Sequence, residues 1–285
     1  MSLGWKRPVP EGWMEILWEA MAEDLGAMDP SAAIFEPDHM SDWYIEAQAE
    51  GVVCGAGLAF SLLQPEADDA ESARTEVLVT DGDRVQRGTM ILRGKAQTSR
   101  LLSKERTALN FLMMLSGTST LTAQFVEKLQ GLETKVVDTR KTAPGLRALQ
   151  KYAVRCGGGV NHRMGLYDGI MIKDNHIRAM GGIKPAVARA KELAGHMTMI
   201  EVECETPQQV EEAIRAGADI VMLDNMDPFT MQDVVRQHGK KVRLEASGGI
   251  TLETARGVAQ TGVHAVSVGA LTHSAPSLPF HLEIA

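Results

Sequence analysis

Six short apolar segments in the second half of the chain each end in residues that could do chemistry. In chain order, the groups at these ends are Thr139–Lys141, Lys173–His176, Glu203, Asp224, Ser247–Gly249 and Gly269. If the segments are parallel strands, their carboxyl ends open on one face of a sheet. The spacing therefore predicts that cations, carboxylates and glycine turns meet at a single rim.

The stretch from Asp138 to Arg178 is basic within an acidic chain. It holds eight Lys and Arg residues against three Asp, whereas the whole chain has a net charge of −8. Arginine can bind carboxylate or phosphate through two parallel hydrogen bonds, so this stretch favours a polyanionic ligand. The expected contacts are the cations that close an apolar strand, namely Arg140, Lys141 and Lys173. The cations at helical spacing are expected on a solvated helix face: Arg147, Lys151 and Arg155.

Glu203 and Asp224 end neighbouring segments and face the same predicted rim. Two carboxylates beside a phosphate-bearing ligand suggest a shared Mg²⁺, which takes a few carboxylates together with substrate oxygens and water. A helix N-cap or an ion pair would use the same residue types. Ser247–Gly249 and Gly269 precede helical patterns, where free backbone N–H groups bind phosphate. Gly157–Gly159 suits a phosphate or a flexible helix end equally.

Elements that could position this rim follow from the hydrophobic patterns. Strands are predicted at 135–138, 169–172, 197–202, 219–223, 241–245 and 263–268, with helices from Pro207 to Gly217 and from Asp227 to Gly239 between them. This alternation predicts a parallel sheet. An incomplete barrel is favoured, because a full one needs about 250 residues, and an open sheet is the alternative. Upstream, the patterns predict a helix at 13–25, extended segments over 38–58, a hairpin of 75–80 with 89–92, and a helix over 98–129 interrupted at Ser116-Gly117.

Composition limits the class of protein. The chain has 285 residues, of which 44% are hydrophobic and 23% charged, and this length suffices for two domains. An acidic chain without a basic tail is a poor partner for nucleic acid, and no apolar run approaches the ~20 residues of a membrane helix. Three cysteines without a C-x-x-C pair favour a reducing compartment, the cytoplasm. The complete dinucleotide fingerprint, the P-loop, H-E-x-x-H and G-x-S-x-G are absent, and the histidines lack zinc spacing.

Several long motifs resemble those of the quinolinate phosphoribosyltransferase family, the carboxylating nicotinate-nucleotide pyrophosphorylases. The resemblance covers nearly the whole chain. Its motifs are Glu105–Asn110, Val137–Arg147, Gly157–Leu166, Ile172–His176, Glu201–Glu203, Leu223–Asn225, Glu245–Ile250 and Ser267–His273. It departs from the family pattern at Ala27–Ser31 and at Thr118–Thr120, and neither segment belongs to the predicted rim.

The resemblance implies a two-domain α/β fold. A seven-stranded incomplete α/β barrel would span residues 118–273, and an N-terminal α+β open-faced sandwich would span residues 1–117, with residues 274–285 packing back on it. It also implies a homodimer or hexamer, in which one subunit's N-terminal domain covers its neighbour's barrel mouth. Arg106, which the spacing alone leaves as an ordinary helix-surface arginine, would then be contributed across the interface.

The implied activity is transfer of phosphoribosyl from 5-phosphoribosyl-1-pyrophosphate to quinolinate with decarboxylation. The products are nicotinate mononucleotide, pyrophosphate and CO₂, as in NAD biosynthesis, and the reaction uses Mg²⁺ with the pyrophosphate substrate and no organic cofactor. The two quinolinate carboxylates are expected on Arg106, Arg140, His162, Arg163 and Lys173. The wider substrate-binding set adds Thr139, Lys141, Glu203, Asp224, Ser247, Gly248, Gly249, Val268, Gly269 and Ala270. The expected catalytic residues are Lys141, Lys173, Glu203 and Asp224, the last two also next to Mg²⁺.

Two other functions stay open at this point. A related barrel enzyme, such as the molybdenum-transport-associated paralogue, would act on another pyridine or base. Against it, Asn161–Arg163 and Lys173–His176 resemble a clamp for two carboxylates, which such an enzyme would not need. A non-catalytic sensor of a phosphate ligand, built on the same fold, would bind without turnover.

Overall fold

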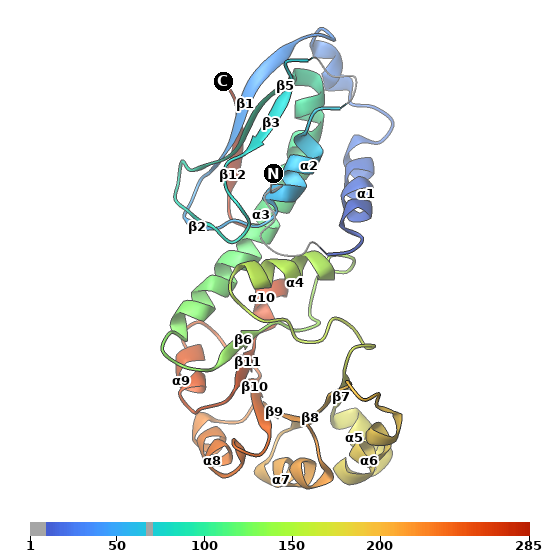
Figure 1. Ribbon diagram of the computed structural model, residues 1–285, viewed down its shortest axis with the longest axis vertical. Helices are drawn as coiled ribbons and strands as arrows, with labels where there is room; N and C mark the ends of the chain where they lie inside the picture. The colour runs from blue at the N-terminus through green and yellow to red at the C-terminus, as the bar shows by residue number, and fades with distance from the viewer. Residues whose placement is uncertain (1–9, 67–70) are drawn as a thin grey trace. The chain divides into compact units, whose positions relative to one another are not determined.

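The computed structural model describes residues 10–66 and 71–285, which form two compact units (Figure 1). The first, called here the N-terminal unit, takes the described residues up to Ala123 together with 142–158 and 271–285. The second, called here the sheet unit, takes residues 124–141 and 159–270. The domain boundary expected at residue 117 lies inside one continuous helix, α3 (Thr98–Lys128).

An antiparallel sheet packs against helices in the N-terminal unit. Its strand order is β12 (Phe280–Ile284), β1 (Met40–Ala47), β5 (Met90–Gln97) and β3 (Arg74–Val77). Because β12 pairs with β1, the end of the chain completes the N-terminal sheet. The remaining elements are α1 (Trp13–Leu25), the 3-10 helix η1 (Pro30–Ile34), β2 (Gly51–Val52), α2 (Ala56–Leu63), β4 (Arg84–Val85), α4 (Arg147–Cys156) and α10 (Ala270–His273), whose first residue is counted in the sheet unit.

The carboxyl group of Asp81 ties three segments of this unit together. Asp81 is fully buried, and its Oδ1 accepts the backbone N–H groups of Gly55 and Ala56 at 2.9 and 3.0 Å, where α2 begins. Its Oδ2 accepts the hydroxyl of Tyr152 on α4 at 2.9 Å. Burial is the main reason that the pKa of Asp81 is raised to about 6.

Six parallel strands form the sheet unit. Their order is β6 (Lys135–Val137), β11 (Ala265–Ser267), β10 (Arg243–Ser247), β9 (Ile220–Asp224), β8 (Ile200–Cys204) and β7 (Ile170–Ile172). The helices that follow the strands are α5 (Asp174–Met180), α6 (Ile183–Leu193), α7 (Pro207–Ala216), α8 (Pro228–His238) and α9 (Ala255–Ala259). Figure 1 shows α6–α9 along one side of the sheet. At the β6 edge, an isolated parallel bridge joins Val160 to Val137.

Side chains of the central strands alternate in character with the period of two that strand geometry imposes. In β8, Val202 and Cys204 are completely buried, whereas the intervening positions are Glu201 and Glu203. In β10, Leu244 and Ala246 alternate with Glu245 in the same way. One face of the sheet is therefore apolar, and the other carries acidic side chains.

The predicted elements agree with the structure except near two glycines. The helix expected at 13–25 is α1, Gly217 ends α7, and the hairpin of β3 with β5 is present. Extended structure up to residue 58 was wrong, because α2 begins at Ala56, directly after Gly55 at φ 101°.

The interruption expected at Ser116-Gly117 is absent, and α3 runs straight through it. A Cβ on Gly117 would lie 2.2 Å from the carbonyl oxygen of Pro276, and the Ser116 hydroxyl accepts the N–H of Cys54. The Ser-Gly pair therefore serves close packing against other segments rather than breaking the helix.

Within the described ranges, no helix has the length and apolar character needed to cross a membrane. The three cysteines, Cys54, Cys156 and Cys204, are buried free thiols.

The buried Asp81 predicts a specific pH dependence of stability. Its pKa is about 6 in the folded chain against a reference value of 3.8, so the native state holds the proton more tightly and stability falls as pH rises from about 4 to about 6. The loss amounts to about 3 kcal/mol. Asp81→Asn lacks this term, so its unfolding free energy relative to wild type should rise by about that amount between pH 4 and pH 7.

Urea unfolding followed by tryptophan fluorescence measures this difference, because Trp13, Trp18 and Trp43 all belong to the N-terminal unit. A difference between Asp81→Asn and wild type that stays constant across this pH range would show that Asp81 titrates normally in the folded chain.

Candidate active site

The carboxyl ends of the parallel strands carry most of the predicted site residues. Thr139–Lys141 follow β6, Lys173 follows β7, Glu203 and Asp224 lie at the ends of β8 and β9, and Ser247 ends β10. Val268–Ala270 follow β11. Parallel pairing of neighbouring strands places these groups on one edge of the sheet, as the sequence predicts.

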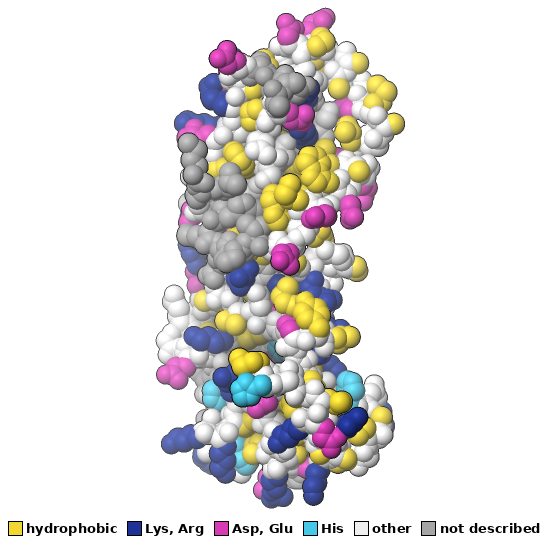
Figure 2. All heavy atoms as spheres, turned by 45° about the vertical axis from the view of Figure 1, so that its right-hand side comes forward, with side chains coloured by type: hydrophobic (Ala, Val, Ile, Leu, Met, Phe, Trp, Pro, Cys, Tyr) yellow, Lys and Arg dark blue, Asp and Glu magenta, His cyan; other side chains and the backbone are white. Residues whose placement is uncertain are grey.

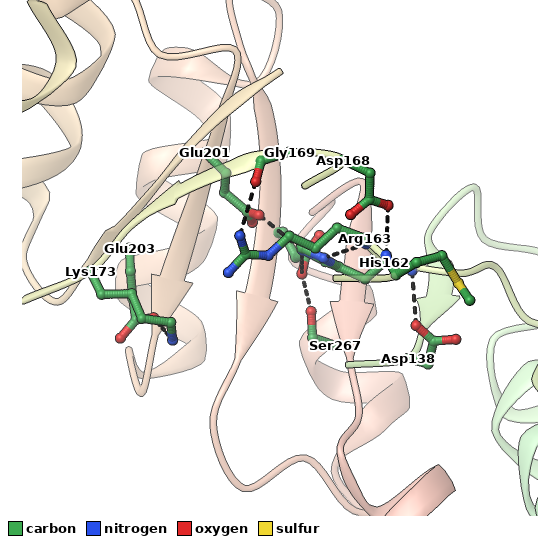
Figure 3. Close-up of polar contacts among 11 residues, drawn as sticks. Asp138, His162, Arg163, Asp168, Gly169, Lys173, Glu201, Glu203 and Ser267 are labelled. Carbon is green, nitrogen blue, oxygen red and sulfur yellow. Dashed lines mark hydrogen bonds and ion pairs between the residues drawn. The ribbon is translucent and has the colours of Figure 1, made fainter. Parts of the chain in front are cut away.

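One ion pair crosses this edge. Lys173 Nζ lies 2.7 Å from Glu203 Oε2, and the Glu203 side chain is largely buried whereas that of Lys173 is nearly half exposed (Figure 3). A predicted anion-binding cation and a predicted substrate-binding carboxylate therefore neutralise each other in this state. Asp224 accepts a hydrogen bond from the side chain of its neighbour Asn225 at 2.8 Å.

A buried aspartate shapes the loop that carries His162 and Arg163. Asp138, which directly follows β6, accepts the backbone N–H of His162 at 2.9 Å and the Asn161 side-chain amide at 2.6 Å. Further along, Arg163 Nη1 donates to the carbonyl of Gly169 at 2.9 Å, and Asp168 accepts the backbone N–H of Met164 (Figure 3). Both ends of the loop are thus held by hydrogen bonds to charged side chains.

His162 lies among acidic side chains from two strands. Its Nε2 is 2.8 Å from Glu201 Oε2 and 3.7 Å from Glu245 Oε1, and both glutamates are more than nine-tenths buried. The Ser267 hydroxyl donates to Glu245. Burial, and after it the neighbouring Glu201, raise the pKa of Glu245 well above that of an ordinary glutamate. We call these three residues, His162, Glu201 and Glu245, the inner cluster.

Two arginines of the predicted site, Arg140 and Arg163, interact electrostatically. Burial is the main cause of the lowered pKa of Arg163, and the positive charge of Arg140 is the next. The Nε of Arg140 is buried and has no hydrogen-bond partner among the described residues. Like charges so placed repel one another, so a bound anion would be strongly favoured between them.

A strained turn follows β10. Gly248 and Gly249 have φ of 102° and 60°, and Asn225, at the end of the neighbouring strand, has φ of 54°. A Cβ on Gly248 would lie 2.1 Å from Asn225 Oδ1, so only glycine fits. The residues predicted to hold the 5′-phosphate therefore form a turn whose backbone is closely packed against the end of β9.

A cavity of about 1030 Å³ opens at the opposite ends of the strands. It is lined by the first residues of β6, β7, β9, β10 and β11 and reaches His162, Glu201 and Glu245. Arg163 also lines it, together with Asp168 and Gly169, whereas Lys173, Glu203, Asp224 and Ser247 do not. The inner cluster thus lies at the inner end of this cavity, whereas the predicted rim lies at the other end of the strands.

The structure adds residues that the sequence analysis did not assign to the site: Asp138, Glu201 and Glu245. A usable signal was present, because an acidic residue in the middle of a buried strand needs a partner. Lys151 on α4 is almost completely buried, which contradicts the solvated face expected for it. Arg106 is exposed on α3 in the N-terminal unit.

Comparison with known proteins gives consistent matches over nearly the whole chain. Residues 30–116 match the N-terminal domain of quinolinate phosphoribosyl transferases, and residues 118–283 match the C-terminal domain. The probable nicotinate-nucleotide pyrophosphorylase (carboxylating) of Bacillus subtilis is 44% identical over 92% of this chain and 90% of its own length.

A second relative and a solved structure agree. The nicotinate-nucleotide pyrophosphorylase (carboxylating) of Mycobacterium leprae is 41% identical over 82% of this chain and 83% of its own. The structure of the nicotinate-nucleotide pyrophosphorylase from Francisella tularensis superimposes with a TM-score of 0.88 at 38% identity, covering 95% of each chain.

The strained turn predicts the effect of one methyl group. Gly248→Ala should lower the unfolding free energy by about 2 kcal/mol, because the added Cβ meets Asn225 and the positive φ disfavours alanine. Gly257→Ala is the matched control, since Gly257 lies within α9 with open space around it, and this change should leave stability unchanged or raise it. Urea denaturation followed by circular dichroism compares the two, and equal effects would contradict the packing argument.

Proposed function

This chain belongs to the quinolinate phosphoribosyltransferase family, and on that premise we propose how its residues carry out the family reaction. It is a pentosyltransferase that joins quinolinate to the phosphoribosyl group of 5-phosphoribosyl-1-pyrophosphate. The products are nicotinate mononucleotide, pyrophosphate and CO₂. This reaction is a step of NAD biosynthesis. The observation that carries the assignment of residues is the strand-end rim itself, where the buried Nε of Arg140 has no hydrogen-bond partner among the described residues and Lys173 lies 2.7 Å from Glu203.

Quinolinate carries two adjacent ring carboxylates. Their two negative charges would balance the positive charges of the basic residues at the rim. We assign the carboxylates to Arg140, Arg163 and Lys173, with Thr139 and Lys141 beside them. Binding would replace repulsion between Arg140 and Arg163 with paired hydrogen bonds. Lys173 would exchange Glu203, its 2.7 Å partner, for substrate.

The second substrate is assigned to the other strands of the rim. Glu203 and Asp224 would accept hydrogen bonds from the ribose hydroxyls. Their negative charges would also stabilise the partly positive ribose of the transition state. The turn Ser247–Gly249 and the backbone of Val268–Ala270 would bind the 5′-phosphate through N–H groups. The tight fit of Gly248 against Asn225 holds that turn in one conformation.

Mg²⁺ would enter with the pyrophosphate, whose charge it neutralises when bound. Glu203 is already paired with Lys173, and Asp224 accepts from Asn225, so these residues fit hydroxyls and water better than a direct metal cage. We therefore place them next to the Mg²⁺–pyrophosphate group, in contact through water. The scheme uses no organic cofactor.

The chemistry then proceeds in two steps. The ring nitrogen attacks the anomeric carbon as the bond to pyrophosphate breaks, and holding both reactants in line supplies much of the rate gain. The nitrogen becomes positive, so the C2–carboxylate bond can break, with its electron pair left on C2 and CO₂ released. A proton then adds to C2, and Lys141 and Lys173 are the cations placed to assist.

Three further features belong to the proposal. The Val160–Val137 bridge continues the six-stranded sheet beyond β6, and we take it as the seventh strand of an incomplete barrel. The buried free thiols fit a reducing cytoplasm.

Hydrophobic side chains gather on the upper part of Figure 2, and Trp18, Met28 and Ile34 of the N-terminal unit are more than half exposed. We assign this surface to a subunit interface of a dimer or larger assembly.

The decisive assay supplies quinolinate, phosphoribosyl pyrophosphate and Mg²⁺ and follows CO₂ and pyrophosphate together. We expect equal release of both products from quinolinate. Nicotinate is the matched control, because it lacks the carboxylate that is lost, and it should react far more slowly. Equal activity on nicotinate, or binding without turnover, would support the paralogue or the sensor instead.

Mixing inactive variants tests the contribution of Arg106 across the interface. Arg106→Ala and Arg140→Ala should each be inactive, but random exchange of subunits should restore about a quarter of wild-type activity, because half the dimers then hold one intact site. Mixing Arg140→Ala with Glu203→Ala is the control and should restore nothing. No recovery in the first mixture would place Arg106 outside the partner's site.

A further inference from the structure

Both ring nitrogens of His162 are already engaged by the chain. The backbone N–H of Arg163 donates to Nδ1 of His162 at 2.8 Å. Because Nδ1 accepts this hydrogen bond, it carries a lone pair and no proton. The ring proton is therefore on Nε2, which faces Glu201 Oε2 at 2.8 Å. His162 has no N–H left with which to hold a substrate carboxylate.

This tautomer also removes His162 as a metal ligand at the inner cluster. His162, Glu201 and Glu245 bring possible ligand atoms within 4.8 Å of one another. A metal-binding imidazole offers the lone pair of one nitrogen and donates a proton from the other. Here the Nδ1 lone pair is used by Arg163 and Nε2 carries the proton, so the inner cluster is a hydrogen-bonded group.

The cluster connects the interior of the sheet unit to Arg163. Glu201 on β8 accepts from the imidazole, the imidazole accepts the N–H of Arg163, and Arg163 Nη1 donates to Gly169. Figure 3 shows this continuous series from Glu201 through His162 to the guanidinium. Arg163 is thus fixed at its backbone and at its tip.

We propose that Glu201, through His162, is a positioning residue that sets the orientation of Arg163 for quinolinate. Glu245 lies on another side of the imidazole, 3.7 Å from Nε2. This inference rests on the proposed function, in which Arg163 binds a carboxylate. It also replaces the expected direct contact of His162 with substrate: the imidazole acts through Arg163. The charged groups that face His162 are Glu201, Glu245, Asp138 and Arg163.

Two substitutions of similar size at residue 201 test the proposal. Glu201→Gln keeps an oxygen that can accept the Nε2 proton, and Glu201→Leu removes it. For Glu201→Leu, we expect kcat/KM for quinolinate to fall at least about tenfold, since a small misplacement of a binding group can cost that much. The KM for phosphoribosyl pyrophosphate should change less than about twofold, and Glu201→Gln should recover most of the loss.

Each alternative has its own result. Equal losses in Glu201→Gln and Glu201→Leu would show that the charge matters rather than the accepting oxygen, which overturns the proposal. Equal changes in KM for both substrates would indicate general disruption, which also overturns it. Wild-type turnover in the same assay separates this question from the proposed function, which fails if wild type does not consume quinolinate.

His162→Asn provides a second test that does not depend on the folding of Glu201→Leu. As part of the hydrogen-bonded series, the imidazole stays neutral, so the ratio of wild-type to variant kcat/KM for quinolinate should be the same at pH 6 and pH 8. An imidazolium that held a carboxylate would lose its charge as the pH rises above its pKa, which is about 6.5 for a free imidazole. A ratio that falls towards one at pH 8 would therefore restore direct contact and overturn the proposal.

Discussion

A carboxylate that leaves water for the interior of a protein must find hydrogen-bond donors or a proton, and around His162 the sheet unit supplies donors to Asp138, Glu201 Oε2 and Glu245 but leaves Glu201 Oε1 without a partner among the described residues. Asp138 accepts hydrogen bonds from a backbone N–H and a side-chain amide, Glu201 accepts one from the imidazole of His162, and burial raises the pKa of Glu245 to about 7. Because each partner comes from a different strand or loop, satisfying the carboxylates also fixes the loop from Asn161 to Gly169. The position of Arg163 depends on this arrangement.

The basic groups at the rim are arranged in the opposite way. Arg140 and Arg163 repel each other, and Lys173 is neutralised by Glu203. This state has unfavourable contacts that an anion with two carboxylates would relieve. Most of the acidic interior is paired within the chain, although Glu201 Oε1 has no hydrogen-bond partner among the described residues, whereas in our proposal the basic rim is completed by the substrate. That difference separates residues that position the site from residues that bind.

The N-terminal unit uses the same physical device for another purpose. Asp81 is buried like Asp138, but its three hydrogen bonds go to the start of α2 and to Tyr152 on α4. It joins segments that are far apart in sequence. A buried acid is therefore not by itself a sign of catalysis, and its partners decide which role it has.

Much of this protein could be determined from the amino-acid sequence alone. Hydrophobic period, helix caps and glycine turns predict the parallel strands and α1, α7 and α8, because these signals act over a few neighbouring residues. The residues that end the strands could likewise be named, since parallel strands open on one edge.

Only the tertiary structure decided three other points: that Ser116-Gly117 packs inside a continuous helix, that Lys151 is buried, and that Glu201 and Glu245 surround His162. Each of these depends on contacts between residues far apart in the chain. No local pattern determines such contacts, because burial and hydrogen-bond partners are set by whichever distant segment packs alongside.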